Sequence, residues 1–246
     1  MYAQQARQLG QLLATHIEQG RQEVACGLLL PILSGPMEFR LLDQIGAPVG
    51  RLAPLTVNSF LDWIGSTHTE GGWVVIGSAL REWIILNMAV SFERTRQFII
   101  LADVWHATDS FGERVLGPAM LYDLPLAFEL LDHWRQDANR WVRRATGVAV
   151  HFWGKRTRGA SGSAPQAQTL LAFLEPLFEE RNWDALKGVG WGLKTLGRYY
   201  PDLVSEWLVV QIVEQKRPFR PLILRKALTF LPEADRGKVT QGLASR

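Results

Sequence analysis

The fold class follows from one stretch of sequence, Gly188-Val-Gly-Trp-Gly-Leu-Lys-Thr-Leu-Gly-Arg-Tyr-Tyr200. At about 100° per residue its apolar side chains fall on a single arc, formed by Val189, Leu193, Leu196 and Tyr200. Trp191, Lys194 and Arg198 are spaced i, i+3, i+7 on the opposite side. The stretch therefore predicts an amphipathic helix whose outer face carries a large aromatic ring and two cations.

Similar amphipathic segments recur along the chain, at 79–86, 111–116, 141–148 and 224–230. Helical periodicity dominates from about residue 74 onward, and no stretch alternates in the way a half-buried strand does. The irregular spacing, roughly 30 to 50 residues, is typical of helix-pair repeats with variable loops. Such pairs bury one face against their neighbours and stack into a curved solenoid. We expect an all-α fold in one domain, 1–246, with a concave, positively charged surface.

Chain breakers separate the predicted helices. Gly71-Gly72 is expected to precede one helix, and Gly117-Pro118 to follow another. The segment 158–165 is rich in Gly and Ser and reads as a surface loop, and Pro201 ends the Trp191 helix. In the first 45 residues, only 3–19 has a clear amphipathic helical pattern.

Composition indicates a soluble globular protein. Hydrophobic residues make up 47% of the 246 residues, and mean hydropathy is close to zero. The longest apolar run is 24–33, which is too short to cross a bilayer, and we expect no secretory leader at the N-terminus. Cys26 is the single cysteine and is expected to be a buried, inert thiol. We therefore expect a cytoplasmic protein without a disulfide.

No motif for a metal or a nucleotide cofactor stands out. The histidines are scattered, without a spacing that suits metal ligands. Gly188, Gly190 and Gly192 imitate part of a nucleotide-binding loop, but they lie within a helical pattern and no strand precedes them. The sequence thus predicts neither a metal nor a cofactor.

Positive charge gathers in the second half of the chain. The net charge is only +3, but 135–158 carries seven cations against one acid, Asp137, and 216–226 carries five cations and no acid. A polyanion is therefore the expected partner.

The helix predicted from Arg140 onward has a cationic stripe opposite its apolar one. The stripe consists of Arg140, Arg144, His151 and Lys155. Such a stripe is often only solvated. Gly147 lies among these residues and favours contact instead, because a missing side chain lets a phosphate backbone approach closely.

Asp109 and Trp191 each have a functional and a purely structural interpretation. Asp109 follows Trp105 by four residues, so the two share a face if the segment is helical, but Thr108-Asp109-Ser110 is also an ordinary helix N-cap signal. Trp191 is either an aromatic wall facing a polyanion, or a ring that packs on a neighbouring loop or under Arg198 as a cation–π pair.

Three of these motifs occur in an order that resembles the alkylpurine DNA glycosylases built from HEAT-like helical repeats. The motifs are Trp105-His-Ala-Thr-Asp109, Trp141-Val-Arg-Arg-Ala145 and Gly188-Val-Gly-Trp-Gly-Leu-Lys194. The likeness is best over 46–231; the first 45 residues are helical but without a counterpart.

The resemblance implies an enzyme that hydrolyses the N-glycosidic bond of cationic N3- or N7-alkylated purines in double-stranded DNA. It implies that Asp109 stabilises positive charge on the sugar, that Trp105 and Trp191 contact the deoxyribose, and that Arg144 binds a phosphate. The expected contacts to the DNA backbone are Arg140, Arg143, Lys155, Lys194, Arg198, Arg225 and Lys226. The protein is expected to be a monomer that acts without a cofactor, a metal or a membrane.

Two other functions remain open on sequence alone. A non-catalytic HEAT-like module for damaged or unusual DNA would keep the same cations, with Asp109 as a helix cap. A protein-binding solenoid would have a more acidic or mixed concave face.

Overall fold

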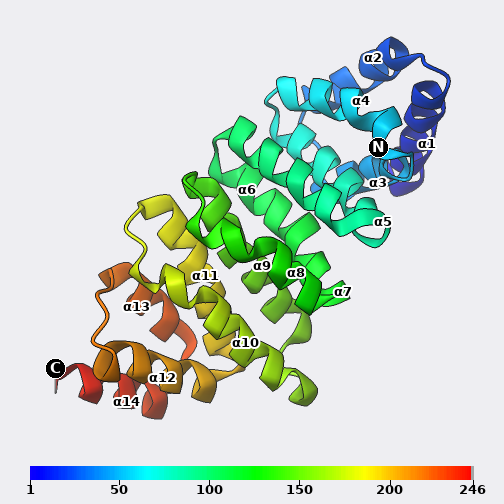
Figure 1. The fold of residues 1–246 in the computed structure, drawn as a ribbon. Helices are drawn as coiled ribbons and strands as arrows, with labels where there is room; N and C mark the ends of the chain where they lie inside the picture. The colour runs from blue at the N-terminus through cyan, green and yellow to red at the C-terminus, as the bar shows by residue number, and fades with distance from the viewer. Residues whose placement is uncertain (245–246) are drawn as a thin grey trace. The chain divides into compact units, whose positions relative to one another are not determined.

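The computed structural model describes residues 1–244, and within that range the chain is helical throughout, without a strand (Figure 1). The contacts divide the chain into two compact units, Met1–Ala119 and Met120–Arg246. The all-α prediction is confirmed.

Unit 1 contains the helices α1 (Ala3–Glu18), α2 (Gln22–Leu33), α3 (Phe39–Gly50), α4 (Pro54–Ser66), α5 (Glu70–Ala102) and α6 (Trp105–Phe111). Helices α1, α3 and α5 pack against one another in that order. Glycines set the closest approach: a Cβ on Gly46 would lie 2.4 Å from the carbonyl oxygen of Val75, and one on Gly50 would lie 2.1 Å from that of Ala79. The backbones of α3 and α5 touch because no side chain stands between them.

Helix α5 is a hairpin rather than a rod. Asn87 leaves the helical region at φ −161° and ψ 94°. Ser91 Oγ donates to the carbonyl oxygen of Leu80 at 2.8 Å, although eleven residues of straight helix would separate them by about 16 Å. The chain therefore reverses at Asn87, and 70–86 packs against 88–102.

Helix α5 also contains an 18-residue apolar window, which is longer than the ten-residue run 24–33 noted in the sequence. By length and composition alone it could cross a membrane, but 61% of its apolar window is buried. Burial and the reversal at Asn87 both fit a core helix of a soluble fold. The α1 prediction is confirmed to within a residue, whereas Cys26 on α2 is half-buried and not buried as expected.

Two predicted breaks do not interrupt helices. Gly71 and Gly72 form the first turn of α5, after the N-cap Thr69, whose hydroxyl accepts from the Gly72 amide at 3.2 Å. Gly117 and Pro118 lie inside a helical run that continues from α6 through a π turn, Gly112–Leu116, into α7 (Gly117–Tyr122). The sequence signal failed there because Pro is tolerated near the start of a helical segment.

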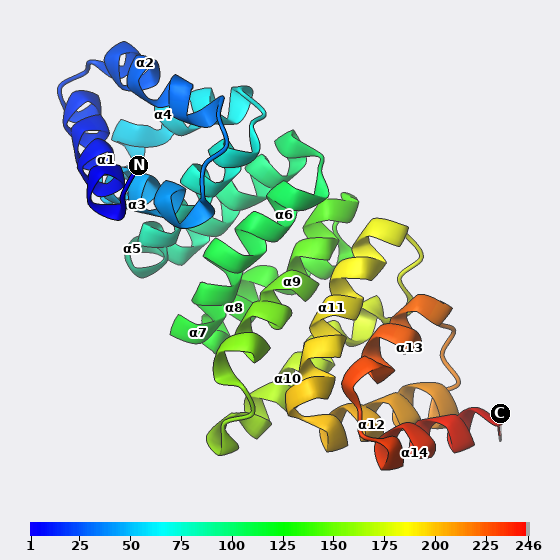
Figure 2. The same cartoon turned by 180° about the vertical axis from the view of Figure 1, so that it is seen from behind.

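Unit 2 is built on α9 (Arg140–Thr157), α11 (Trp183–Tyr199) and α13 (Pro221–Ala227), which lie side by side (Figure 2). Its remaining α-helices are α8 (Leu124–Leu131), α10 (Ala164–Leu174), α12 (Pro201–Val209) and α14 (Glu233–Ala244). The predicted loop at 158–165 contains one short 3-10 turn, Ser161–Ser163, before α10 begins. Pro201 does separate α11 from α12, as predicted.

Asparagines fix the starts of the two central helices of unit 2. The side chain of Asn139 accepts from the amide of Trp141 at 2.8 Å, and that of Asn182 accepts from the amide of Asp184 at 3.0 Å. Each cap satisfies amides that the first turn leaves without a partner. The two caps start α9 and α11 at fixed points, and these helices carry most of the candidate residues.

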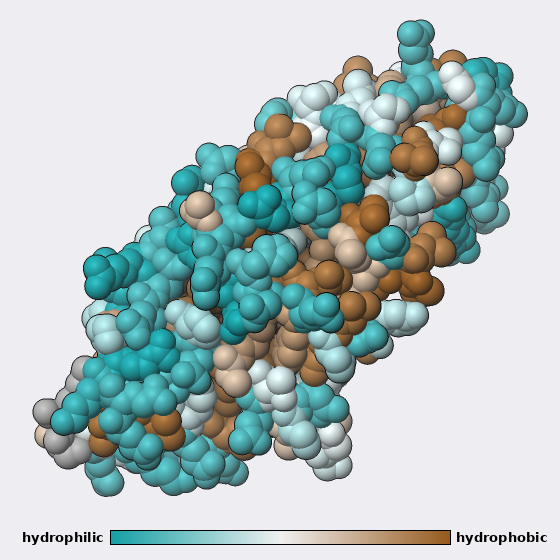
Figure 3. Space-filling model, viewed as in Figure 1, coloured by the Kyte–Doolittle hydropathy of each residue, from teal (hydrophilic) through white to brown (hydrophobic). Residues whose placement is uncertain are grey.

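Hydrophilic side chains predominate on the face drawn in Figure 3, with separate hydrophobic patches between them. Leu55, Ile85 and Leu86 are among the large apolar side chains that stand exposed. Scattered exposure of this kind is ordinary for a soluble protein.

Candidate nucleic-acid interface

In unit 1, Trp105 and Asp109 lie one helical turn apart on α6. The helix begins at Trp105 with Val104 as its N-cap, so Asp109 is an interior position. The alternative interpretation of Asp109 as a helix cap is therefore wrong, because a capping side chain must precede the first turn. Trp105 is 57% exposed and Asp109 is half-buried. The pair thus presents a carboxylate and an indole on one face of a short helix.

In unit 2, the outer face of α11 has the residues that its sequence pattern predicts. Val189, Leu193 and Leu196 are fully buried, whereas Trp191 and Lys194 are half-buried and Arg198 is exposed. The alternative of a Trp191–Arg198 pair is wrong. Trp191 instead stacks on His151 of α9, with ring centroids 4.2 Å apart and planes 15° apart.

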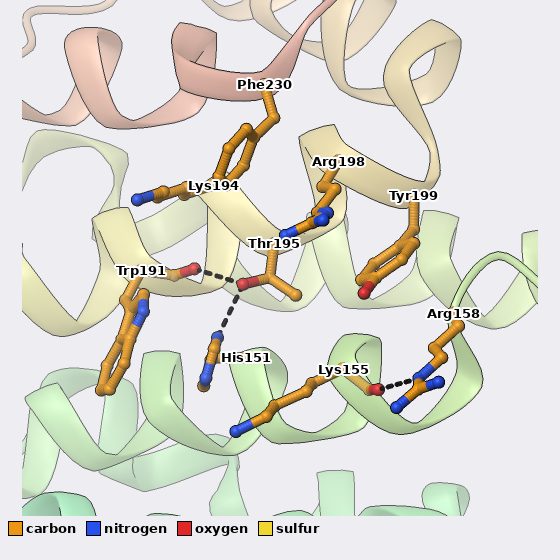
Figure 4. Close-up of a pocket in the computed structure, with 9 residues that line it drawn as sticks. All are labelled: His151, Lys155, Arg158, Trp191, Lys194, Thr195, Arg198, Tyr199 and Phe230. Atoms are coloured by element: carbon orange, nitrogen blue, oxygen red, sulfur yellow. Dashed lines mark hydrogen bonds between the residues drawn. The ribbon is translucent and has the colours of Figure 1, made fainter.

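His151 lies beside Trp191 and is hydrogen-bonded to Thr195 (Figure 4). The Thr195 hydroxyl donates to the carbonyl oxygen of Trp191 at 3.1 Å, so its only proton is used. His151 Nδ1 lies 2.6 Å from the same hydroxyl oxygen, which can accept a hydrogen bond from the ring. Burial, followed by the charges of Lys155 and Lys194, lowers the pKa of His151 to about 4. The ring therefore supports Trp191 without adding charge at neutral pH.

The predicted cationic stripe on α9 is not an evenly exposed face. Arg144 is only 6% exposed and His151 only 8%. The Arg144 guanidinium donates to the carbonyl oxygen of Asp184 at 3.1 Å and lies 6.0 Å from the Trp141 ring centroid. Lys155 is exposed, as the stripe requires. The solvated-surface interpretation is thus wrong for Arg144 and His151, because both are packed against α11.

Arg140 and Arg143 have carboxylate partners. Arg140 Nε lies 3.5 Å from Asp184, with the side chain 40% exposed. Arg143 Nε lies 2.6 Å from Glu180, and its guanidinium also donates to the Asp137 carbonyl oxygen at 2.6 Å. Because this pair is mostly buried, Arg143 belongs to the framework of unit 2. We do not retain it among the DNA contacts.

Gly147 has a different role from the one predicted. A Cβ there would lie 2.3 Å from the carbonyl oxygen of Gly188, and one on Gly188 would lie 2.5 Å from that of Arg144. The missing side chain therefore brings α9 against α11, and leaves no space for a phosphate. The same contact explains the Gly188-x-Gly190-x-Gly192 pattern without a nucleotide loop, since a Cβ on Gly192 would lie 2.8 Å from the Gly147 carbonyl oxygen.

Two cationic pockets open on this face of unit 2. The first has a volume of about 350 Å³ and is lined by His151, Lys155, Arg158, Trp191, Lys194, Thr195, Arg198, Tyr199 and Phe230 (Figure 4). The second has a volume of about 380 Å³ and is lined by Arg144, Trp183, Lys187, Trp191, Lys194, Leu222, Arg225 and Lys226. We call them the Arg198 pocket and the Lys187 pocket. Most of the predicted DNA-contacting cations of unit 2 line one of the two.

Sequence reasoning missed several residues of these pockets. Trp183 is 57% exposed at the start of α11, and Lys187 Nζ lies 5.5 Å from the centre of its ring. The i, i+4 spacing of this aromatic and this cation, directly after the Asn182 cap, was a usable signal. Arg158 and Phe230 gave no such signal, because they come from the ends of other helices.

The basic run 216–226 divides into two parts. Arg217 lies 2.7 Å from Glu179 and 3.2 Å from Glu175, so it forms ion pairs within unit 2. Arg225 and Lys226 on α13 reach the Lys187 pocket instead. Among residues 1–244, no group of three or more His, Cys, Asp or Glu is placed to hold a metal ion.

Residues 79–231 match the DNA alkylation repair enzyme family. That match covers more than half of the chain, and the protein therefore belongs to this family. It includes α6 and both cationic pockets. A search of curated proteins found no match.

Proposed function

We propose that this protein is a DNA glycosylase that hydrolyses the N-glycosidic bond of cationic N3- or N7-alkylated purines in double-stranded DNA. Membership of the DNA alkylation repair enzyme family implies a repair enzyme with a DNA substrate. The observation that supports the finer proposal is the placement of Asp109 one turn after Trp105, inside α6, where it is not consumed as a helix cap.

The chemistry of the lesion suits a lone carboxylate. An alkylated purine carries a positive charge, so it departs as a neutral base and needs no general acid. Positive charge then develops on the deoxyribose, water adds at the anomeric carbon, and a proton is lost to solvent. A carboxylate about 4 Å from that charge, at an effective dielectric near 20, contributes roughly 4 kcal/mol, or about a thousandfold in rate. We assign this role to Asp109.

Trp105 and Trp191 are proposed to contact the deoxyribose, with their ring faces favouring the cation. Arg144 is proposed to bind a phosphate, and it can do so only at the rim of the Lys187 pocket, since its side chain is mostly buried. The contacts to the DNA backbone are proposed to be Arg140, Lys155, Lys194, Arg198, Arg225 and Lys226.

We further propose that the helices stack as HEAT-like repeats in a single solenoid domain, and that the protein is a cytoplasmic monomer that works without a metal. One cooperative unfolding transition and a monomeric mass by light scattering are the expected results. Two separate transitions would refute the single domain.

The deciding experiment measures release of free 7-methylguanine from methylated double-stranded DNA. Asp109→Asn should lower the release at least tenfold, while folding and DNA affinity stay close to wild type. Glu38→Gln is the matched control, because that acid is 63% exposed and pairs with Arg40, which is 78% exposed. Binding of DNA without any release by the wild type would make the non-catalytic module the better account.

A further inference from the structure

The Arg198 pocket and the Lys187 pocket lie on either side of two shared residues, Trp191 and Lys194. The shared pair forms a ridge on α11 with a cationic hollow on each flank. Neither lining contains an aspartate or a glutamate.

Aromatic rings keep the cations close together. Phe230 has the Lys194 ammonium 4.8 Å and the Arg198 guanidinium 5.0 Å from its ring centre. Neither cation has a carboxylate within 4.0 Å among residues 1–244. Two like charges beside one ring repel each other, and an anion between them removes that repulsion.

Packing also positions the cations of the Lys187 pocket. A Cβ on Gly190 would lie 3.0 Å from Cγ of Lys226, so the glycine lets that side chain cross α11. The Lys187 ammonium lies 5.5 Å from the centre of the Trp183 ring. The cations therefore reach their positions through packing, before any ligand binds.

The two hollows are too far apart for neighbouring phosphates of one strand. Lys187 and Arg198, which each line one pocket only, are eleven residues apart, or about 16 Å along the axis of α11. One strand of B-form DNA presents a phosphate about every 3.4 Å of axis, so this distance covers several nucleotide steps. Trp191 lies between the two hollows.

We propose that the two pockets are separate phosphate sites, which bind different phosphodiesters of one DNA duplex, several nucleotide steps apart, on the two sides of Trp191. The inference rests on the proposed function in taking DNA as the ligand and the lesion site as the point that fixes its register. It assigns each pocket its own phosphate, and it makes Arg158 and Lys187 DNA contacts.

The test uses a duplex with a single abasic-site analogue, which fixes the register, and a series in which one phosphate at a time is an uncharged methylphosphonate. The wild type should bind more weakly when a phosphate on either side of the analogue is neutralised. Each neutralised contact should flatten the slope of log K against log salt by about 0.9.

Two double variants then show which pocket binds the phosphates on which side of the analogue. Arg158→Gln/Arg198→Gln should become insensitive to methylphosphonates on one side of the analogue only, and Lys187→Gln/Lys226→Gln on the other side only. Arg156→Gln is the matched control: it is an exposed arginine on α9 that lines neither pocket, so its profile should equal that of the wild type.

The proposal is overturned if both double variants lose sensitivity at the same phosphates, or if neither does. Binding of inorganic phosphate or a mononucleotide in the pockets, with an unchanged methylphosphonate profile on duplex DNA, would also overturn it, since the sites would then serve free phosphates. Failure of the wild type to bind DNA at all would instead contradict the proposed function.

Discussion

Replacing Gly147 with alanine tests the packing that joins α9 to α11. The new Cβ would meet the Gly188 carbonyl oxygen at 2.3 Å, and ordinary contact requires about 1 Å more. Backbone atoms cannot rotate away, so the two helices must separate by roughly that amount. Because α9 carries His151 and α11 carries Trp191, the same shift would open their stacked pair.

The magnitude follows from the contacts that the shift weakens. A buried leucine makes about 40 contacts of about 0.1 kcal/mol each, and a gap of this size forfeits about a quarter of that energy. Val150 of α9 and Leu174 of α10 pack beside Gly192 of α11, and His151 of α9 stacks on Trp191 of α11, so three side chains of this size lose about 3 kcal/mol. Alanine returns up to about 1 kcal/mol in helix propensity. The net expectation is a destabilisation of about 2 kcal/mol.

Urea unfolding followed by circular dichroism measures this difference. Gly237→Ala is the control, because that glycine lies within α14 of the same unit with nothing within 4 Å of the added methyl group, so propensity alone should stabilise the variant. If Gly147→Ala were as stable as Gly237→Ala, the close contact of α9 with α11 would be wrong.

Three further results are expected. The pKa of His151 is lowered from 6.5 to about 4 in the folded protein, so between these pH values the unfolded chain binds a proton that the folded protein does not. The free energy of unfolding should therefore fall by a few kcal/mol as pH drops from about 6.5 to 4. In urea titrations, His151→Gln should flatten this pH dependence. Arg143→Gln should lower the free energy of unfolding by about 2 kcal/mol or more, because it leaves Glu180 buried without its partner. The salt dependence of DNA binding should stay unchanged. A flatter slope of log K against log salt would show that Arg143 does contact DNA. Asn182→Ala should cost about 1 kcal/mol through the lost cap of α11, and unchanged thermal unfolding would contradict the cap.

Periodicity in the sequence was sufficient for the fold class and for the faces of the long helices. The core arc of α11 and its cationic face are as predicted, since a side chain's direction on a helix depends only on its position along the chain. The same reasoning gave the start of α1 and the break at Pro201, which are local features of the backbone.

The sequence could not predict which residues each side chain contacts, because the contacting residues lie on other helices. Arg143 and Arg144 are neighbours in a basic run, but one is paired with Glu180 and the other is packed against α11. The sequence suggested that Gly147 leaves space for a phosphate, but the backbone of Gly188 occupies that space. Asp109 read equally well as a cap until α6 was seen to begin at Trp105.

The sequence by itself determined an all-helical chain with its positive charge in the second half, because hydrophobic period and charge are properties of the residues in order. Only the tertiary structure decided which cations remain available to a ligand. That outcome depends on which carboxylate, ring or backbone lies within a few ångströms: Arg217 is paired with Glu175 and Glu179, whereas Lys194 and Arg198 lie together over Phe230 in an acid-free pocket.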